Sequence, residues 1–406
     1  MNRYSHWICC QIGARENYAI PRALHKNRKL EYLITDAWLS PHNPVKAIAP
    51  KSLQERYTYD LDSANKYAFT TDLIRFELQN KLSKTLGWQL IIKRNFWFQQ
   101  KSLEKLKKVA NSLNQANYPI VLFSYSYAAL ELFKFAKQQG WLTVLGQIDP
   151  GVEEEKIVLQ EYQEHPNYAP NWRPAPLDYW QNWREECDLA DAILVNSSWS
   201  KQLLQNSGVN NQKIHILPLV YSPSVLSNDF IREYPNSFSE NRPIRVLFLG
   251  QVILRKGIIA VLEAIKILEH LPIEFWIVGS SQIEIPTYFQ NHPKIIWLGQ
   301  VNRSETITFY QKTDIFLFPT LSDGFGLTQL EAQAWQLPII ASRNCGEVVT
   351  NGVNGWVLEE VSGIAIADVL KRCIAQPENL VKLAKQTKLS SKFSIDNLAT
   401  NLANIL

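Results

Sequence analysis

The segment FPTLSDGFGLTQLEAQAWQLP, residues 318–338, carries more structural information than any other stretch of this 406-residue chain. An apolar strand is expected to end near Phe318, and a Gly-rich turn then leads into a helix that begins near Thr328. Gly324 and Gly326 leave backbone N–H groups accessible beside the positive end of that helix, which suits an anionic or hydroxyl-rich ligand. The segment predicts a strand–turn–helix unit with a ligand at its turn.

Two carboxylates belong to the same segment. Asp323 lies on the turn and Glu331 lies in the first turn of the helix, where either could accept hydrogen bonds from sugar or ribose hydroxyls. Two structural explanations stay open. Thr328-Gln-Leu-Glu331 is a capping box, so Glu331 could serve only the helix start, and Asp323-Gly324 could be only a turn.

Short apolar runs alternate with helical patterns along the whole chain, which predicts βαβ units and parallel sheets of the α/β class. Several of these runs end in Gly or Pro, as tight strand-to-helix turns require. The expected strands are Trp7–Ile12, Glu31–Thr35, Ile120–Phe123, Leu142–Leu145, Ala192–Asn196, Ile214–Leu217, Ile244–Leu249, Glu274–Val278, Ile295–Leu298, Asp314–Phe318, Pro338–Ala341 and Trp356–Leu358.

The length of the chain favours two domains, and a polar, proline-bearing stretch at Tyr221–Pro243 is the natural linker between them. We expect an N-terminal Rossmann-like domain at 1–221, a linker at 222–243 and a C-terminal Rossmann-like domain at 244–385. Residues 386–406 return to helical spacing and could pack back on the N-terminal domain. Two doubly wound domains would face a central cleft at the carboxyl ends of their strands, where such sheets bind ligands.

A second segment, VLFLGQVILRKG at 246–257, places two cations at a strand end. The strand is followed by Gly250, by Arg255 and Lys256, and then by the start of a helix. Two fixed positive charges can hold a diphosphate and stabilise it as it leaves. Taken alone, an Arg-Lys-Gly sequence fits a solvated basic turn better.

Together the two segments resemble the retaining GT-B glycosyltransferases of family 4, also called group 1. The resemblance is strongest over 244–358 and fainter towards the end of the first half. The matching blocks are Gly250–Gly257, Phe275–Gly279, Asp323–Glu331, Leu337–Ser342, Gly346–Gly355, Asp191–Ser200 and Lys213–Pro218. The collinear set is specific, although no single block is.

The resemblance implies a role for each matching residue. Lys256 would contact the donor diphosphate with Arg255 as a helper, and Asp323 would lie near the donor sugar. Glu331 would hold the ribose. The remaining donor-binding positions are Gly250, Gly324, Phe325, Gly326 and Leu327, and Gly13 would approach the ligands from the opposite domain.

The chain departs from the family pattern at three places. Gln251 stands where many relatives carry Arg, and Asp323 is one methylene shorter than the usual Glu. Many relatives also have a His at the cleft after a first-domain strand, whereas the corresponding stretch here, 144–150, has none. Asp149 is the nearest polar candidate for a catalytic role, but Asp149-Pro150 fits a turn initiator slightly better.

The resemblance implies a retaining glycosyltransferase that moves a sugar from a UDP- or GDP-sugar to a hydroxyl of a glycan, a lipid-linked compound or a small molecule. The leaving diphosphate would assist the incoming hydroxyl, while the protein supplies orientation and charge stabilisation. No metal or cofactor is expected. The departures keep two alternatives open: a catalytically silent nucleotide-sugar-binding subunit, and another GT-B enzyme such as an epimerase.

Composition narrows the setting of this activity. A net charge of +4 does not suggest a nucleic-acid partner, and five cysteines without metal spacing suggest a reducing compartment, so we expect a cytoplasmic protein. The region Trp88–Lys108 mixes aromatic and basic residues. It could dock on the inner face of an anionic membrane, in which case neutralising Lys101, Lys105 and Lys108 would weaken binding to vesicles. The pattern favours instead a buried strand followed by a solvated helix.

Overall fold

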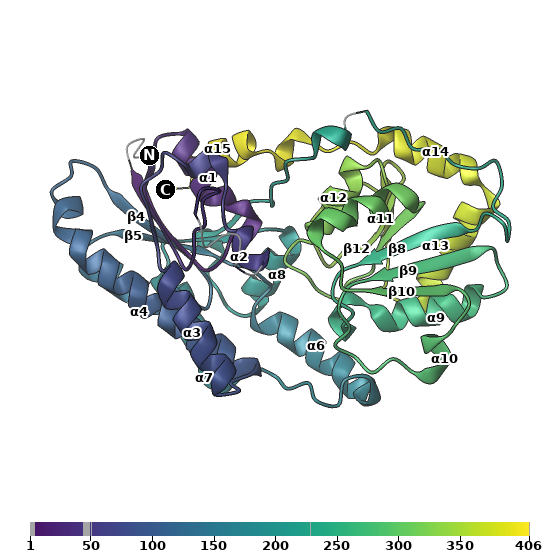
Figure 1. Cartoon of the computed structure of the whole chain (residues 1–406), viewed down its shortest axis with the longest axis horizontal. Helices are drawn as coiled ribbons and strands as arrows, with labels where there is room; N and C mark the ends of the chain where they lie inside the picture. The colour runs from purple at the N-terminus through teal and green to yellow at the C-terminus, as the bar shows by residue number, and fades with distance from the viewer. Residues whose placement is uncertain (1–4, 44–48, 50, 228, 406) are drawn as a thin grey trace.

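The computed structural model describes residues 5–43, 49, 51–227 and 229–405, which form two parallel sheets joined by a linker (Figure 1). The N-terminal sheet has seven strands in the order β3-β2-β1-β4-β5-β6-β7. Their bounds are β1 His6–Gln11, β2 Leu30–Thr35, β3 Lys66–Ala68, β4 Ile120–Tyr125, β5 Leu142–Gly146, β6 Ala192–Val195 and β7 Ile214–Ile216.

The C-terminal sheet has six strands in the order β10-β9-β8-β11-β12-β13. Their bounds are β8 Ile244–Leu249, β9 Ile273–Val278, β10 Ile295–Gly299, β11 Ile315–Phe318, β12 Ile339–Ser342 and β13 Gly355–Leu358. In both sheets the order reverses beside the first strand of the domain, and a ligand crevice is expected at such a switch point.

Helices cover both sheets, which explains why strands such as β4 and β12 are buried at every position. The α-helices are α1 Ala19–Lys26, α2 Lys51–Gln54, α3 Thr70–Leu82, α4 Gly87–Asn114, α5 Leu130–Gln138, α6 Val152–Glu164, α7 Leu177–Leu189, α8 Ser198–Asn206, α9 Ile258–Leu268, α10 Thr287–Gln290, α11 Thr306–Lys312, α12 Thr328–Ala334, α13 Gly363–Ala375, α14 Pro377–Gln386 and α15 Ile395–Leu402. Short 3-10 turns complete several connections, among them η7 at Leu254–Lys256 and η8 at Arg303–Glu305.

Each of the twelve expected strands is present, and the sequence missed one. β3 has only three residues, lies at the edge of its sheet and is partly exposed, so it shows none of the apolar patterning that marks the others. The expectation of a buried strand within Trp88–Lys108 is wrong. The whole region belongs to α4, a single helix of 28 residues.

The apolar run at the start of α4 obscured its helical period. Further along, the buried positions recur every three to four residues, as a helix with one packed face requires. They are Phe98, Gln99, Ser102, Leu106, Ala110 and Leu113. Among the described residues, no helix combines the length and the apolar character needed to cross a membrane.

The end of the chain returns to the first domain. In Figure 1, α14 and α15 run along one side of the molecule from the C-terminal sheet to the N-terminal sheet. Lys26 on α1 forms an ion pair with Asp396 on α15, and the Asn27 side chain donates to the Ala399 carbonyl at 3.3 Å. α6 lies between the two sheets on the other side.

Candidate functional site

The C-terminal domain supplies two cations from one turn. β8 ends at Leu249, and the chain passes Gly250 into the short η7 turn that carries Arg255 and Lys256. The next residue, Gly257, has φ +72°, and a Cβ there would lie 1.9 Å from the Pro319 carbonyl oxygen. Glycine is therefore required at this position, because the η7 turn packs directly against the loop that follows β11.

That second loop brings Asp323 to the two cations. Asp323 forms an ion pair with Lys256, and the Arg255 Nη1 lies 3.7 Å from the same carboxylate oxygen. Arg255 also donates to the Ser322 carbonyl at 2.7 Å. Burial raises the pKa of Asp323, but Lys256 and Arg255 outweigh it, so the pKa lies below its usual value and the carboxylate is ionised.

The N-terminal domain meets this cluster at the loop after β5. Asp149 accepts a hydrogen bond from the Tyr127 hydroxyl at 2.5 Å and one from the Gly151 N–H at 2.9 Å. A Cβ on Gly324 would lie 2.6 Å from the Ile148 carbonyl oxygen, so the two domains touch at Gly324. The carboxyl ends of both sheets thus converge on Asp149, Asp323 and the two cations.

Sequence reasoning missed Glu154, which joins the two halves of this cluster. It lies in the first turn of α6, accepts a hydrogen bond from the Ser322 hydroxyl at 2.7 Å and lies 3.7 Å from Arg255. Burial raises the pKa of Glu154 to about 7, although Arg255 lowers it. A signal was available, because Glu153-Glu154-Glu155 follows the expected strand at Leu142–Leu145 and the Asp149-Pro150 turn.

Trp199 and Ser200 on α8 were also missed. The Trp199 indole N–H donates to the Ser322 hydroxyl at 2.9 Å, and the Ser200 hydroxyl donates to the Gly324 carbonyl at 3.3 Å. Both contacts cross between the domains. They lie in the Asp191–Ser200 block of the family resemblance, where the sequence pattern gave no hint of a partner.

The structure places Glu331 outside the ion-pair cluster. Its carboxylate accepts the Tyr310 hydroxyl at 2.8 Å, and α12 has no side-chain cap, so the capping box suggested by the sequence is not formed. Burial raises the pKa of Glu331, although the Tyr310 hydroxyl and Arg303 lower it. The residue as a whole is only partly buried.

The other predicted donor positions shape the loop. Gly326 has φ +85°, and a Cβ there would meet the Phe318 ring at 2.4 Å. Phe325 is fully buried, and its N–H points to the Asp323 carboxylate at 3.3 Å. Leu327 precedes α12 as its N-cap, and its carbonyl accepts the Leu330 N–H at 2.9 Å.

Two predicted glycines lie at the ends of strands. Gly250 donates its N–H to the Val278 carbonyl at 2.9 Å, which ties the end of β8 to β9. Gly13 has φ +74° and donates its N–H to Asp36 at 2.9 Å. Gly13 also accepts a hydrogen bond from the Gln11 amide, so both of these contacts stay within the N-terminal domain.

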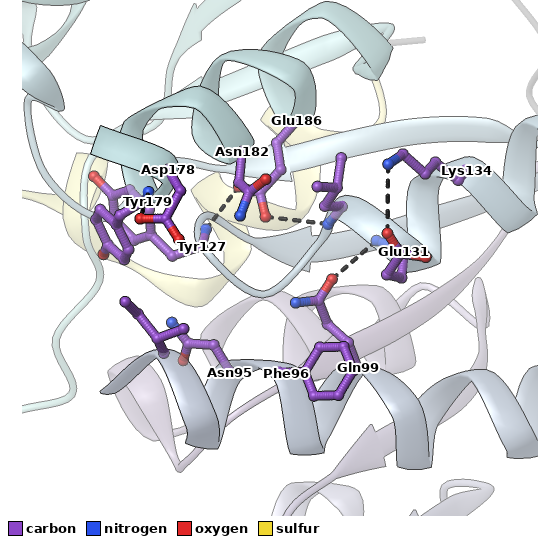
Figure 2. Close-up of a pocket in the computed structure, with 12 residues that line it drawn as sticks. Asn95, Phe96, Gln99, Tyr127, Glu131, Lys134, Asp178, Tyr179, Asn182 and Glu186 are labelled. Atoms are coloured by element: carbon purple, nitrogen blue, oxygen red, sulfur yellow. Dashed lines mark hydrogen bonds and ion pairs between the residues drawn. The ribbon is translucent and has the colours of Figure 1, made fainter. Parts of the chain in front are cut away.

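Two adjoining cavities open on the N-terminal side of the site. They have volumes of about 260 and 290 Å³ and share Asn95 on α4, Tyr127 after β4 and Tyr179 on α7. The Tyr127 and Tyr179 rings stack at 4.6 Å, and the Tyr127 hydroxyl reaches Asp149. Figure 2 shows one cavity between α4 and the segment that carries Glu186. The cavities therefore adjoin the point at which the domains touch.

Glu186 holds one wall of this space. Its carboxylate accepts the backbone N–H groups of Tyr127, Ala129 and Leu130 at 2.7, 2.8 and 3.1 Å, which satisfies the start of α5. Burial raises the pKa of Glu186 to about 7, although these N–H groups lower it. The buried Tyr125 hydroxyl in the second cavity has no hydrogen-bond partner in the described structure.

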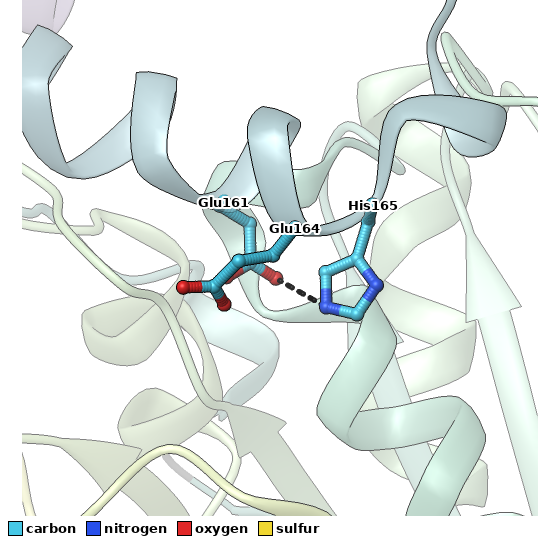
Figure 3. A group of neighbouring side chains, drawn as sticks. All are labelled: Glu161, Glu164 and His165. Atoms are coloured by element: carbon cyan, nitrogen blue, oxygen red, sulfur yellow. Dashed lines mark ion pairs between the residues drawn. The ribbon is translucent and has the colours of Figure 1, made fainter.

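A group with metal-ligand chemistry lies at the far end of α6. The ligand atoms of Glu161, Glu164 and His165 lie within 4.8 Å of one another (Figure 3). His165 Nε2 is 3.8 Å from Glu161, and Glu164 is exposed. Acidic side chains at a helix end gather without an ion often enough that this group carries no functional assignment.

Comparison with known proteins relates the C-terminal half of the chain to glycosyltransferases. Residues 230–390 match the family described as glycosyl transferases group 1. The glycosyltransferase CapM of capsular polysaccharide biosynthesis in Staphylococcus aureus is 25% identical over 201 residues, 45% of this chain and 52% of that protein. The D-inositol 3-phosphate glycosyltransferase of Xylanimonas cellulosilytica is 26% identical over 242 residues, 53% of this chain and 56% of that protein. The chain thus spans about half the length of these curated relatives.

Solved structures extend the likeness to the whole chain. Anabaena HepE in complex with UDP has a TM-score of 0.59 at 14% identity and covers 98% of both chains. Sucrose-phosphate synthase from Thermosynechococcus elongatus has a TM-score of 0.64 at 15% identity, also over 98% of both chains. At this identity the likeness shows the fold. It is GT-B, two Rossmann-like domains whose strand ends face each other.

Proposed function

We propose that the protein is a retaining glycosyltransferase that transfers a sugar from a nucleotide-diphosphate sugar to a hydroxyl acceptor. The observation that carries this is the cluster of Arg255, Lys256 and Asp323 at strand ends of one domain, facing Asp149 at a strand end of the other. Cations at a partly water-excluded junction can bind a diphosphate and stabilise its charge as the glycosidic bond breaks.

The donor binds to the C-terminal domain in this proposal. Lys256 and Arg255 hold the diphosphate, Asp323 contacts the transferred sugar and Glu331 binds the ribose. The group 1 match over residues 230–390 covers all four positions. Both UDP and GDP sugars are candidates, and the UDP and UDP-glucose in the HepE structures support a nucleotide sugar as the donor class.

The acceptor binds in the cavities between α4 and α7. Amides of Asn95, Gln99 and Asn182 line them beside the stacked Tyr127 and Tyr179 rings, a combination that suits a hydroxyl-rich ligand. The Tyr127–Asp149 hydrogen bond links these cavities to the cations. The acceptor hydroxyl would then approach the anomeric carbon from the N-terminal side, with the leaving diphosphate as its proton acceptor.

A thermal-shift screen against UDP- and GDP-sugars tests the donor site, because a ligand of the native state raises its apparent stability. Lys256→Ala and Glu331→Ala should each abolish the shift given by the correct donor. Lys382→Ala, an exposed position on α14, is the matched control and should keep it. A shift retained in both site variants would refute the assignment.

Turnover separates the enzyme from a silent binding subunit. The enzyme should release free nucleotide diphosphate from the donor that gives the thermal shift, slowly with water and faster with acceptors from a cell extract. A donor that binds normally but is never consumed would favour the silent-subunit alternative, for which Gln251 and Asp323 are the departures that matter.

A further inference from the structure

Glu154 is a largely buried acid at the proposed phosphate site, and the proposed mechanism assigns it no role. It comes from the N-terminal domain, yet its hydrogen-bond and ion-pair partners, Ser322 and Arg255, both belong to the C-terminal domain. Its side chain is only 13% exposed. The carboxyl group therefore lies within 4 Å of a guanidinium that the proposed function assigns to the donor diphosphate.

With every group ionised, the net charge around Glu154 is unfavourable for binding a diphosphate. Arg255 and Lys256 already face Asp323 and Glu154, and Asp149 acts on both Glu154 and Arg255. Three ionised carboxylates against two cations make a net charge of about −1, and a diphosphate would add about two more negative charges. Like charges this close raise one another's pKa strongly, so binding favours the neutralisation of one carboxyl group.

Glu154 is the group best placed to take the proton. Lys256 keeps Asp323 ionised, and the Asp149 carboxylate already accepts hydrogen bonds from Tyr127, Gln147 and Gly151. Around Glu154, Arg255 and the Ser322 hydroxyl favour the charged form, whereas burial, Asp149 and Asp323 oppose it and raise the pKa to about 7. Tyr162, further along α6, faces Arg255, and α8 contributes the uncharged Trp199 indole through Ser322.

We propose that Glu154 lies beside the bound diphosphate as a neutral carboxylic acid, so that binding of a nucleoside diphosphate takes up one proton at this side chain. The proton comes from solvent, forms an O–H bond on the Glu154 carboxyl group and returns to solvent when the nucleotide leaves. The neutral acid can donate a hydrogen bond to a phosphate oxygen, which an ionised Glu154 would repel. The inference rests on the proposed donor site.

Isothermal titration calorimetry with UDP and with GDP at pH 6, 7 and 8 tests the proposed proton uptake. At pH 8, titrations in two buffers of different ionisation enthalpy should show uptake of about one proton by the wild-type protein. Wild-type Glu154 is largely ionised at pH 8 and must take up a proton on binding, so Glu154→Gln should bind nucleotide more tightly than wild type there, by up to about tenfold. At pH 6 the two proteins should agree within about twofold. The nucleotide's own titration affects wild type and Glu154→Gln equally, so it cancels in the ratio of their affinities.

Two further variants serve as a control and as a second test. Glu153→Gln removes a charge from the same helical turn, where Glu153 pairs with Lys156 at 2.7 Å, and should keep the wild-type pH profile. Ser322→Ala removes a hydroxyl that favours the ionised form of Glu154, so the loss of affinity should move to higher pH.

The outcomes separate this inference from the function on which it rests. A pH profile for Glu154→Gln identical to that of wild type would overturn the inference, and so would weaker binding by that variant at pH 8. If the wild-type protein bound neither UDP nor GDP at any pH, the proposed donor site and the inference would both fall.

Discussion

Arg232 lies outside the candidate site but holds the helices that position part of that site. The side chain is 9% exposed, and its guanidinium donates to the carbonyls of Tyr310, Thr313 and Trp335. These carbonyls lie in the last turn of α11 or just after α11 and α12, where helices leave acceptors unsatisfied. The linker therefore stabilises the two helices that carry Tyr310 and Glu331.

Replacing Arg232 with Met should destabilise the protein by about 3 kcal/mol, because several buried carbonyls lose their donor at once. Urea unfolding followed by tryptophan fluorescence would measure the loss. Arg372→Met is the control, since Arg372 is exposed and donates only to a carbonyl of its own helix in the described structure. Equal unfolding free energies for the two variants would show that Arg232 does not hold these helix ends.

The site residues that could be predicted from the sequence are those with local signals. Arg255, Lys256 and Asp323 lie in Gly-bearing turns directly after strands, so their positions follow from strand ends alone. Trp199 gave no such signal, and the run Glu153-Glu154-Glu155 did not show which of its carboxylates would reach the cluster. The importance of Glu154 and Trp199 comes from contacts with Arg255 and Ser322 in the other domain, and such contacts leave no periodic pattern in the sequence.

Among the elements, strands were more predictable than helices. A buried parallel strand is a short, almost wholly apolar run, so β4, β8 and β11 are visible without any partner. α4 was misjudged because Trp88 to Phe98 contains apolar residues on several sides of the helix. These residues are apolar on several sides because one side of α4 packs in the core, while other sides line the cavities or remain exposed.

Membrane docking through Trp88–Lys108 stays a prediction, and the connection between α3 and α4 just before this region offers a place to test it. Lys101 pairs with Asp72 at 3.5 Å and Lys105 lies over the Tyr67 ring at 4.6 Å, so two of the three lysines first considered have partners within the protein. Leu82 and Leu86, by contrast, are 84% and 75% exposed. They belong to a stretch, Leu78–Leu103, with five basic residues and no acidic one.

If the tip formed by the connection between α3 and α4 docks on anionic membranes, the double variant Leu82→Ser, Leu86→Ser should bind phosphatidylglycerol-containing vesicles more weakly. We expect a loss of about tenfold per leucine, because each substitution removes about 1.4 kcal/mol or more of apolar transfer energy. Vesicle co-sedimentation measures the change. Leu226→Ser in the linker, where Leu226 is 70% exposed, should have no effect. Unchanged sedimentation of the double variant would dispose of membrane docking through this tip.

At the scale of the whole molecule, the linker, α6, α8 and α15 all connect the two domains. The linker passes from β7 to β8, and α6 and α8 touch the loop after β11 through Glu154 and Trp199. α15 returns to the N-terminal domain, where Leu398, Ala399 and Leu402 share a core with strands β1, β4 and β6. α15 is therefore part of the N-terminal domain, so that domain is complete only once α15 has been made.

This arrangement predicts which domain a change at the C-terminus will weaken. Leu402 is buried in that core, and Leu402→Ala should cost about 2–4 kcal/mol from lost apolar contact and the cavity left behind. Hydrogen exchange should show faster exchange of amides in β1 and β4 but not in β8, although β8 is closer in sequence. Thr400→Ala, exposed on the same helix, should change neither. If the loss of protection were confined to the C-terminal sheet, or absent, α15 would not hold the N-terminal domain together.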